Sequence, residues 1–321
     1  MAHWLVLGGT GFVGRALCEA LSRPEHADGP RLLVPSRRPA HGQLLRMLPR
    51  VDLVEADVHD DAALAGLVAG ADAVVNLVAI LHGNAAAFER VHVELPRTLA
   101  RACMAAGVRR VVHLSALGAA ADAPSLYQRS KAAGEAVLRE AGLSLTVLRP
   151  SVIFGAGDRF LNLFARLQAV LPAMPLAGAH ARLQPVWVED VAQAVVRCLV
   201  DDRTAGQTFE ACGPDVRSLA GLVRLAGQWA GVNAGLGRPV IPIPMVLGRL
   251  QALLMELAPG EPLMSRDNLA SLTVDNTASG TLPGLQALGI VPASLAAVAP
   301  DYLGDRGPRS TLDALRRTAG H

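Results

Sequence analysis

The stretch from His3 to Leu21 reads H-W-L-V-L-G-G-T-G-F-V-G-R-A-L-C-E-A-L and decides the fold that we expect for this chain. It begins with a short apolar run, typical of a buried strand, and continues into a helical pattern with apolar residues on one stripe. Between the two stands the spacing Gly8-x-x-Gly11-x-x-Gly14. Glycines at this spacing allow a tight turn, close approach of the backbone to a pyrophosphate, and close packing of helix on strand. The stretch therefore predicts a dinucleotide-binding turn, and a purely structural turn from strand to helix is the alternative.

The sequence up to residue 150 alternates between short apolar runs and longer helical patterns. We expect strands at residues 31–34, 51–56, 73–79 and 108–114, and helices from Asp60 or Asp61 to Gly70, over residues 88–106 with Pro96 as a local irregularity, and over residues 127–140. The run at residues 73–79 is apolar almost throughout, which is typical of a parallel strand covered on both faces. Alternation of this kind predicts an α/β fold with a Rossmann-type, doubly wound parallel sheet.

The pattern changes after Pro150, and the expected domain boundary lies there. We expect residues 1–150 to form an NAD(P)-binding Rossmann domain, to which residues 182–200 return. Residues 151–321 are expected to form mostly a smaller substrate or partner domain. Its end, residues 304–321, has the pattern of a polar linker and a short basic helix capped by Ser310.

Composition excludes several classes of function. The chain has 321 residues, of which 51% are hydrophobic, enough for a large core. Aromatic residues make up only 3% and the formal charge is +2, so neither stacking platforms nor a basic footprint for nucleic acid are expected. The four cysteines are far apart, which predicts no metal site, no disulfide framework and a reducing compartment. With no signal-peptide pattern and no apolar run long enough to span a membrane, we expect a cytoplasmic protein.

The end of the second expected strand indicates which dinucleotide is bound. An acidic residue about 20 residues after the glycine turn would bind the ribose 2′-hydroxyl of NAD. This chain has Ser36, Arg37 and Arg38 there instead. A guanidinium binds phosphate through paired hydrogen bonds, so these residues predict that NADP(H) is preferred over NAD(H). A solvated basic turn is the alternative. Asp57 closes the third strand, where the adenine ring would lie.

A candidate catalytic group follows the expected strand at residues 108–114, which ends at Ser115. The sequence Tyr127-Gln-Arg-Ser-Lys131 opens the next helix, and residues four apart share one helix face. We therefore expect the Lys131 ammonium to lower the pKa of the Tyr127 phenol, and the Ser115 hydroxyl to hold a carbonyl oxygen beside it. The spacing Tyr-x-x-x-Lys is common, and it is specific here because it follows the glycine turn and the serine.

The motifs together resemble a known family. The segments G-G-T-G-F-V-G at residues 8–14, Y-Q-R-S-K at 127–131 and L-R-P-S-V-I-F-G at 148–155 resemble the short-chain dehydrogenase/reductase (SDR) superfamily, extended or atypical branch. Within it, D-R-F-L-N at 158–162, P-V-W-V-E-D-V-A at 185–192, R-D-N-L at 266–269 and V-D-N at 274–276 resemble the SDR-type accessory subunit of respiratory complex I and its bacterial relatives. The resemblance covers nearly the whole chain.

The resemblance implies roles for individual residues. Tyr127 would be the acid/base, Lys131 would lower its pKa and orient the ribose, and Ser115 would polarise the substrate oxygen. The dinucleotide would contact Gly8, Thr10, Gly11, Phe12, Val13, Gly14, Ser36, Arg37, Arg38, Asp57, Val58, Val78, Ala79, Lys131, Pro150 and Val152.

Two positions depart from the active extended enzymes. Ser115 is followed by Ala116 and Leu117 where many of those enzymes have further hydroxyl residues, so either Ser115 or Ala116 occupies the catalytic hydroxyl position. His92 stands where relatives often have an Asn that supports the lysine through water. Two functions therefore stay open. One is a module that holds NADP(H) as a structural or sensing ligand; the other is an NADPH-dependent reductase, dehydrogenase or epimerase.

Two apolar segments after residue 150 bear on substrate and partners. Phe160, Leu161, Leu163, Phe164 and Leu167 offer few hydrogen-bond donors, and we expect them to line a pocket for an apolar substrate, quinone-like, isoprenoid or lipid. Residues 245–257 carry a wide apolar stripe at helical spacing, which we expect to be core. The alternative for this stripe is a surface for a respiratory complex or for the inner face of the cytoplasmic membrane.

Overall fold

The computed structural model describes residues 2–23, 28–257 and 263–304, and the chain divides into two compact units. Unit 1 comprises Met1–Pro150, Val188–Ala211 and Ala278–Val291; unit 2 comprises Ser151–Trp187, Cys212–Thr277 and Pro292–His321. The basic helix expected after Gly304 lies outside the described residues. No helix in the described part of the chain is both long and apolar enough to cross a bilayer.

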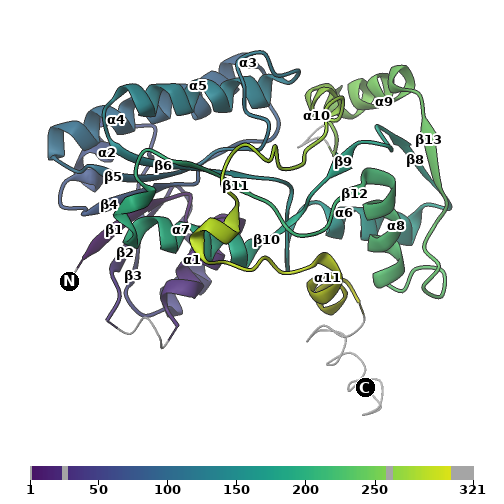
Figure 1. Cartoon of the computed structure of the whole chain (residues 1–321), viewed down its shortest axis with the longest axis horizontal. Coiled ribbons are helices and arrows are strands. Elements are labelled where there is room, and N and C mark those ends of the chain that lie inside the picture. Colours follow the sequence, from purple (N-terminus) through teal and green to yellow (C-terminus); the bar gives the residue numbers. More distant parts are fainter. Residues whose placement is uncertain (1, 24–27, 258–262, 305–321) are drawn as a thin grey trace, which may run out of the picture. The chain divides into compact units, whose positions relative to one another are not determined.

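Unit 1 is built on one sheet of seven parallel strands, in the order β11-β6-β5-β4-β1-β2-β3 (Figure 1). The strands are β1 (His3–Leu7), β2 (Arg31–Ser36), β3 (Val51–Glu55), β4 (Ala73–Asn76), β5 (Arg110–Leu114), β6 (Ser144–Pro150) and β11 (Thr208–Ala211). The order reverses at β1, which pairs with β2 on one side and β4 on the other. The predicted doubly wound parallel sheet is confirmed, and ligands of such sheets bind beyond the carboxyl ends of the strands at the reversal.

Helices cover both faces of this sheet (Figure 1). One face carries α2 (Asp61–Val68), α3 (Ala85–Glu89), α4 (Leu95–Ala106) and α5 (Leu126–Glu140); the other carries α1 (Phe12–Leu21) and α7 (Val188–Val200), which pack together. Shorter turns are η2 (Pro39–Met47), the π-helical η3 (Arg90–Glu94), η4 (Asp202–Thr204) and η5 (Leu285–Leu288). Asp60 is the N-cap of α2, since its side chain accepts from the Ala63 N–H.

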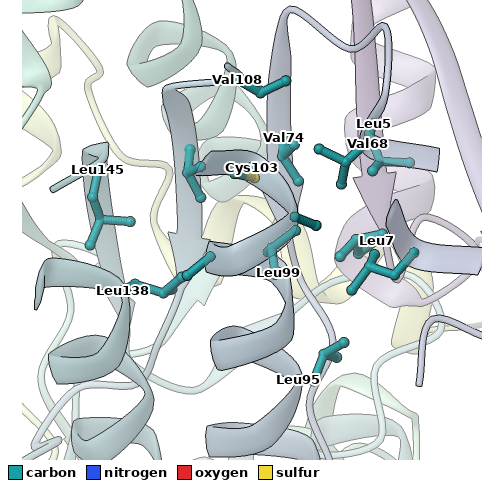
Figure 2. Packing of buried hydrophobic residues seen from close by; sticks show 14 of the residues in the cluster. Leu5, Leu7, Val68, Val74, Leu95, Leu99, Cys103, Val108, Leu138 and Leu145 are labelled. Carbon is teal, nitrogen blue, oxygen red and sulfur yellow. The ribbon is translucent and has the colours of Figure 1, made fainter. Parts of the chain in front are cut away.

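The core of unit 1 lies between the sheet and α2, α4 and α5, where apolar strand residues meet the inner faces of the helices (Figure 2). Leu5 and Leu7 of β1, Val74 of β4 and Leu99 of α4 belong to it and are almost completely buried. Burial of each such side chain contributes about 1.5–3 kcal/mol to the free energy of unfolding, so this layer holds the strands of the sheet in place.

Two elements of unit 1 differ from the sequence prediction. The strand expected over residues 73–79 ends at Asn76, because the Asn76 side chain accepts from the Val78 N–H and turns the chain. The helix expected over residues 88–106 is interrupted at η3, ahead of Pro96, which sits in the first turn of α4. A Pro there needs no N–H partner, so the irregularity is a π turn and not a proline kink.

Unit 2 has short strand pairs and a small helical core. The strands are β7 (Ile153–Phe154), β8 (Met174–Ala177), β9 (Arg182–Leu183), β10 (Val186–Trp187), β12 (Arg217–Ser218) and β13 (Val240–Ile243); the helices are α6 (Leu161–Val170), α8 (Leu219–Trp229), α9 (Met245–Leu257), α10 (Arg266–Ser271) and α11 (Leu295–Leu303). The pairs are β7 with β10, β8 with β13 and β9 with β12. The core joins α6, α8 and α11.

One expectation for unit 2 is wrong and another stays a prediction. Of the residues expected to line an apolar substrate pocket, Leu161 is buried in the core of the unit, and Phe160, Phe164 and Leu167 are partly buried against it. Partly buried side chains also line pockets, so their role toward a substrate stays a prediction. The stripe of α9, expected to be core, is mostly exposed, and the buried residues of that helix are Gly248 and Ala252. Small residues let α9 approach β8 closely, and its larger side chains point away.

Candidate dinucleotide and catalytic site

The glycine turn joins β1 to α1 with almost no spare space. Gly8 has φ +80°, and a Cβ there would lie 3.1 Å from the Leu77 carbonyl carbon in the segment after β4. A Cβ on Gly14 would lie 2.4 Å from the Gly8 oxygen. Gly11 is the N-cap of α1 and offers no side-chain acceptor to the helix. Among the described residues no side chain caps the first turn of α1, an arrangement that suits a pyrophosphate.

The end of β2 presents basic groups to solvent. Ser36 closes the strand, and its hydroxyl accepts from the Arg38 N–H at 3.2 Å. The side chains of Arg37 and Arg38 are exposed, and neither forms a salt bridge with another described residue. A guanidinium without a carboxylate partner remains available to a phosphate, and the 2′-phosphate contact stays a prediction.

A small polar cavity lies next to the predicted adenine contacts. Its volume is about 90 Å³, and it is lined by Val58, His59, Asp61, Arg90, Glu94, Leu95 and Thr98. Asp57 contacts one of these lining residues, because its side chain accepts from the His59 N–H at 3.0 Å. Burial, Arg90 and Arg37 lower the pKa of His59, whereas Asp57 and Glu94 raise it. Sequence reasoning missed Arg90 and Glu94, since nothing in their local pattern shows that η3 lies beside the β3 loop.

Ser115 follows β5 directly and is buried, with 4% of its surface exposed. Its backbone N–H donates to the Leu148 carbonyl oxygen at 2.7 Å, which fixes the residue to β6. Its hydroxyl has no hydrogen-bond partner among the described residues. Ala116 is buried as well and offers no hydroxyl. A buried hydroxyl without a partner is costly, and a substrate oxygen would satisfy it.

Lys131 lies in the second turn of α5 and is almost completely buried. Its Nζ donates to the Leu114 carbonyl oxygen at 2.7 Å, so the ammonium lies at the end of β5. Burial lowers the pKa of Lys131 to about 8, and Glu135 opposes this shift. Glu135, one turn further along the helix, binds Arg149 through both carboxylate oxygens at 2.9 and 2.7 Å. Glu135 was not singled out from the sequence. Its spacing of four residues from Lys131, which places both side chains on one face of the helix, was the available signal.

The expected effect of Lys131 on Tyr127 is wrong in this structure. Burial raises the pKa of Tyr127 to about 12, and the Lys131 ammonium is engaged by the Leu114 carbonyl. The cost of burying a phenolate therefore exceeds the benefit of the cation. Tyr127 is protonated at neutral pH, which is the form that donates a proton during reduction of a carbonyl.

A second polar pair lies at the carboxyl ends of β4 and β5. Asn76 and His113 are register partners, and the Asn76 side-chain amide contacts His113 Nδ1 at 3.2 Å. Burial, Lys131 and His92 lower the pKa of His113 well below its ordinary value, so the ring is neutral. A polar residue at the end of each apolar strand was the available sequence signal for this pair.

The remaining predicted contacts are distributed over several segments. Thr10, Phe12 and Val13 lie in the glycine turn and the first turn of α1; Val78 and Ala79 lie in the loop after β4; Pro150 ends β6 in unit 1; and Val152 belongs to unit 2. The predicted residues of unit 1 thus lie at or after the carboxyl ends of β1 to β6, on both sides of the reversal of strand order. Their assignment to cofactor or substrate stays a prediction.

Comparison with known proteins identifies the family of this chain. A model of the NAD dependent epimerase/dehydratase family matches residues 4–212. The chain belongs to this family. The family consists of extended SDR proteins, so the resemblance seen in the sequence is confirmed.

Relatives of this chain include respiratory NADH dehydrogenase subunits and a reductase. The chain is 33% identical over 299 residues to the mitochondrial NADH dehydrogenase (ubiquinone) 1 alpha subcomplex subunit 9 of Mus musculus, covering 90% of this chain and 76% of the relative. It is 28% identical over 302 residues to the mitochondrial NADH-ubiquinone oxidoreductase 40 kDa subunit of Neurospora crassa, with 93% and 78% covered. It is 36% identical over 195 residues to a ceramide reductase of Caulobacter vibrioides, with 60% and 59% covered.

Solved structures share the fold at low identity. The dTDP-glucose 4,6-dehydratase DesIV of Streptomyces venezuelae, solved with NAD and TYD, has a TM-score of 0.72 at 21% identity and covers 97% of each chain. The UDP-glucuronic acid 4-epimerase of Bacillus cereus has a TM-score of 0.68 at 17% identity, with 94% of this chain and 98% of that chain covered. These likenesses support the architecture of the extended SDR family.

Proposed function

We propose that this protein binds NADP(H) as a structural or sensing ligand. We further propose that it serves a respiratory assembly, because relatives similar to it are named as subunits of NADH dehydrogenase. The observation that carries the proposal is the glycine turn of unit 1, where Gly8 and Gly14 exclude side chains and the first turn of α1 lacks a cap. Arg37 and Arg38 support a 2′-phosphate because they are exposed and have no carboxylate partner among the described residues. Similarity to relatives over 90% of the chain supports the association.

The cofactor preference is tested by titration. NADPH should bind more tightly than NADH, and Arg37→Ala should remove most of the difference, because a charge-assisted hydrogen bond contributes about 1.5–3 kcal/mol, or tenfold or more in affinity. Arg109→Ala is the matched control: Arg109 is also exposed, but it precedes β5 at the amino end of the sheet. Isothermal titration or quenching of tryptophan fluorescence supplies the dissociation constants. Equal affinities for the two dinucleotides would reject the preference.

A second candidate function is reduction of an apolar carbonyl, lipid or quinone-like. It is favoured by the buried Ser115 hydroxyl without a described partner, by the protonated Tyr127 and by the similarity to a ceramide reductase. NADPH, when bound, supplies the hydride that reduces the carbonyl carbon. Ser115 holds the carbonyl oxygen by a hydrogen bond, and Tyr127 gives that oxygen its proton. Lys131, a cation below pH 8, would orient the ribose, the other role that the family resemblance implies for it.

The reductase candidate depends on Tyr127. Tyr127→Phe should abolish oxidation of NADPH by quinones, isoprenoid ketones or lipid ketones and leave NADPH affinity nearly unchanged, because the phenol acts on substrate. A screen of these carbonyls, followed by absorbance at the NADPH band, supplies the assay. Full activity of the Phe variant would overturn the mechanism. Absence of turnover by the wild-type protein, with tight NADPH binding, would leave the structural or sensing function as the better account.

A further inference from the structure

We propose that His92 is a positioning residue that couples the loop after β4, where Val78 and Ala79 lie, to the first turns of α5, which carry Tyr127 and Lys131. The inference rests on the proposed dinucleotide site and concerns how binding there is felt at Tyr127. His92 lies in the π turn η3 between α3 and α4, and only 2% of its surface is exposed. Single π turns inside helices occur frequently at functional sites.

Both ring nitrogens of His92 have partners on different elements. Nε2 lies 3.2 Å from the Ile80 N–H in the loop after β4, and Nδ1 lies 2.8 Å from the Ser130 hydroxyl on α5. A backbone N–H can only donate, so Nε2 must carry the lone pair and Nδ1 the proton. Ser130 then accepts from His92, and its own hydroxyl donates to the Tyr127 carbonyl oxygen at 2.8 Å. One neutral tautomer satisfies the whole chain of hydrogen bonds from Ile80 to Tyr127.

Packing places the same residue against α5. The rings of His92 and Tyr127 lie edge to face, with centroids 5.5 Å apart, and Phe88 stacks on His92 from another side at 5.5 Å. The backbones of η3 and α5 are also close to each other, because a Cβ on Gly134 would lie 2.0 Å from the His92 carbonyl oxygen. Gly134 therefore lets η3 and α5 approach closely enough for the ring to contact Tyr127 and Ser130 together.

Burial, together with the nearby charge of Lys131, keeps His92 in the neutral form. Burial and the Lys131 ammonium lower the pKa of His92 to about 3. A protonated ring would point an N–H at the Ile80 N–H and place a second cation beside Lys131. Neutral His92 accordingly holds the loop and α5 in one arrangement throughout the physiological pH range.

Four variants separate the two hydrogen bonds. The Gln amide in His92→Gln reaches the position of Nε2, where its oxygen can accept from the Ile80 N–H, and leaves the Ser130 hydroxyl without a donor. The shorter Asn amide in His92→Asn reaches the position of Nδ1, where its nitrogen can donate to Ser130, and leaves Ile80 without an acceptor. His92→Leu removes both, and Ser130→Ala breaks the second bond without touching the ring. Exchange of the Ile80 amide is measured by NMR on protein labelled with 15N, and the ring signal of Tyr127 on protein with labelled tyrosine. Tyr302, the other tyrosine of the chain, donates to Asp158 in unit 2 and is an internal reference.

We expect His92→Leu to speed exchange of the Ile80 amide and weaken NADPH binding by about tenfold each, and to shift the Tyr127 signal. His92→Gln should restore the protection of Ile80 alone, and Ser130→Ala should move the Tyr127 signal alone. Wild-type values for Ile80 and Tyr127 in His92→Leu would overturn the proposal. If that variant does not fold, His92→Gln and Ser130→Ala decide through the same two signals. Failure of the wild-type protein to bind NADPH would count against the proposed function, whereas the two signals still decide the role of His92.

Discussion

Lys131 shows how burial sets the properties of a single residue in this site. A lysine in water has a pKa of 10.5, and burial lowers the pKa of Lys131 to about 8 while Glu135 opposes the shift. The ammonium is retained at neutral pH by its bond to the Leu114 oxygen and by the carboxylate one turn away. Keeping a cation in a buried position costs stability, and a functional site is where such a cost is tolerated.

This cost has a measurable pH dependence. Between pH 8 and 10.5 the unfolded chain holds the Lys131 proton and the folded protein does not, so the free energy of unfolding rises with pH through this window. Below pH 8 the full cost, on the order of 3 kcal/mol, is present. Lys131→Met should therefore be more stable than the wild type at pH 7, and its advantage should shrink by pH 10. Urea unfolding at pH 7 and at pH 10 measures the difference in the free energy of unfolding between the variant and the wild type. A difference that does not change with pH would contradict burial of the Lys131 ammonium as its cause.

The glycine turn is the element in which backbone geometry alone makes the binding site. Gly14 faces the Gly8 oxygen and the Gly9 backbone within 2.4 Å of its missing Cβ, so the first turn of α1 sits directly on the turn. Gly66, in the middle of α2, has no atom within 4 Å of the same position and is exposed. Substitution by alanine therefore raises helix propensity at both positions and creates a steric conflict only at Gly14.

We expect opposite results for alanine at these two positions. Gly14→Ala should lower the free energy of unfolding by about 1–3 kcal/mol through overpacking, and should abolish dinucleotide binding because α1 must move. Gly66→Ala should raise the free energy of unfolding by about 0.5–1 kcal/mol, because alanine favours a helix more than glycine, and should leave dinucleotide binding unchanged. Chemical unfolding and NADPH titration measure both effects. Intact NADPH affinity in Gly14→Ala would show that the turn does not hold the dinucleotide.

At the scale of the whole molecule, the exposed side of α9 is the feature that most concerns partners. Val246, Leu247, Leu250, Leu254 and Leu257 of this helix are all more than half exposed. The acidic residue of the helix, Glu256, is paired with Arg266 at 2.8 Å, and Arg249 is its basic residue. An apolar helix face with its carboxylate neutralised is compatible with the surface of a respiratory membrane or a membrane-bound complex.

Vesicle binding tests the membrane alternative. The wild-type protein should sediment with vesicles that contain anionic phospholipid, and Leu250→Glu with Leu254→Glu should prevent this because two carboxylates would enter the interface. Folding should be unaffected, since these side chains are 55% and 62% exposed. Val200→Glu, a control at an exposed apolar position of unit 1, should still sediment. If the wild-type protein stays in the supernatant at low salt, the peripheral membrane role is wrong, and a partner protein becomes the better occupant of α9.

Local sequence features determined much of unit 1. The spacing of Gly8, Gly11 and Gly14 predicted the turn, the alternation of apolar runs and helical patterns predicted the parallel sheet, and Asp60 was one of two predicted caps of α2. These features are readable because each depends on residues that are close together in the chain.

The tertiary structure alone decided the features that depend on distant neighbours. Periodicity predicted the α9 helix, but its apolar side is exposed because packing in unit 2 buries the side of the helix that carries Gly248 and Ala252. The spacing of Tyr127 and Lys131 placed both on one helix face, whereas burial raised the pKa of one and lowered that of the other. The bonds of His92 to Ile80 and Ser130 join segments 12 and 38 residues away. A sequence pattern states which side of an element is apolar or charged; what covers that side, and hence its solvation and partners, is set by packing.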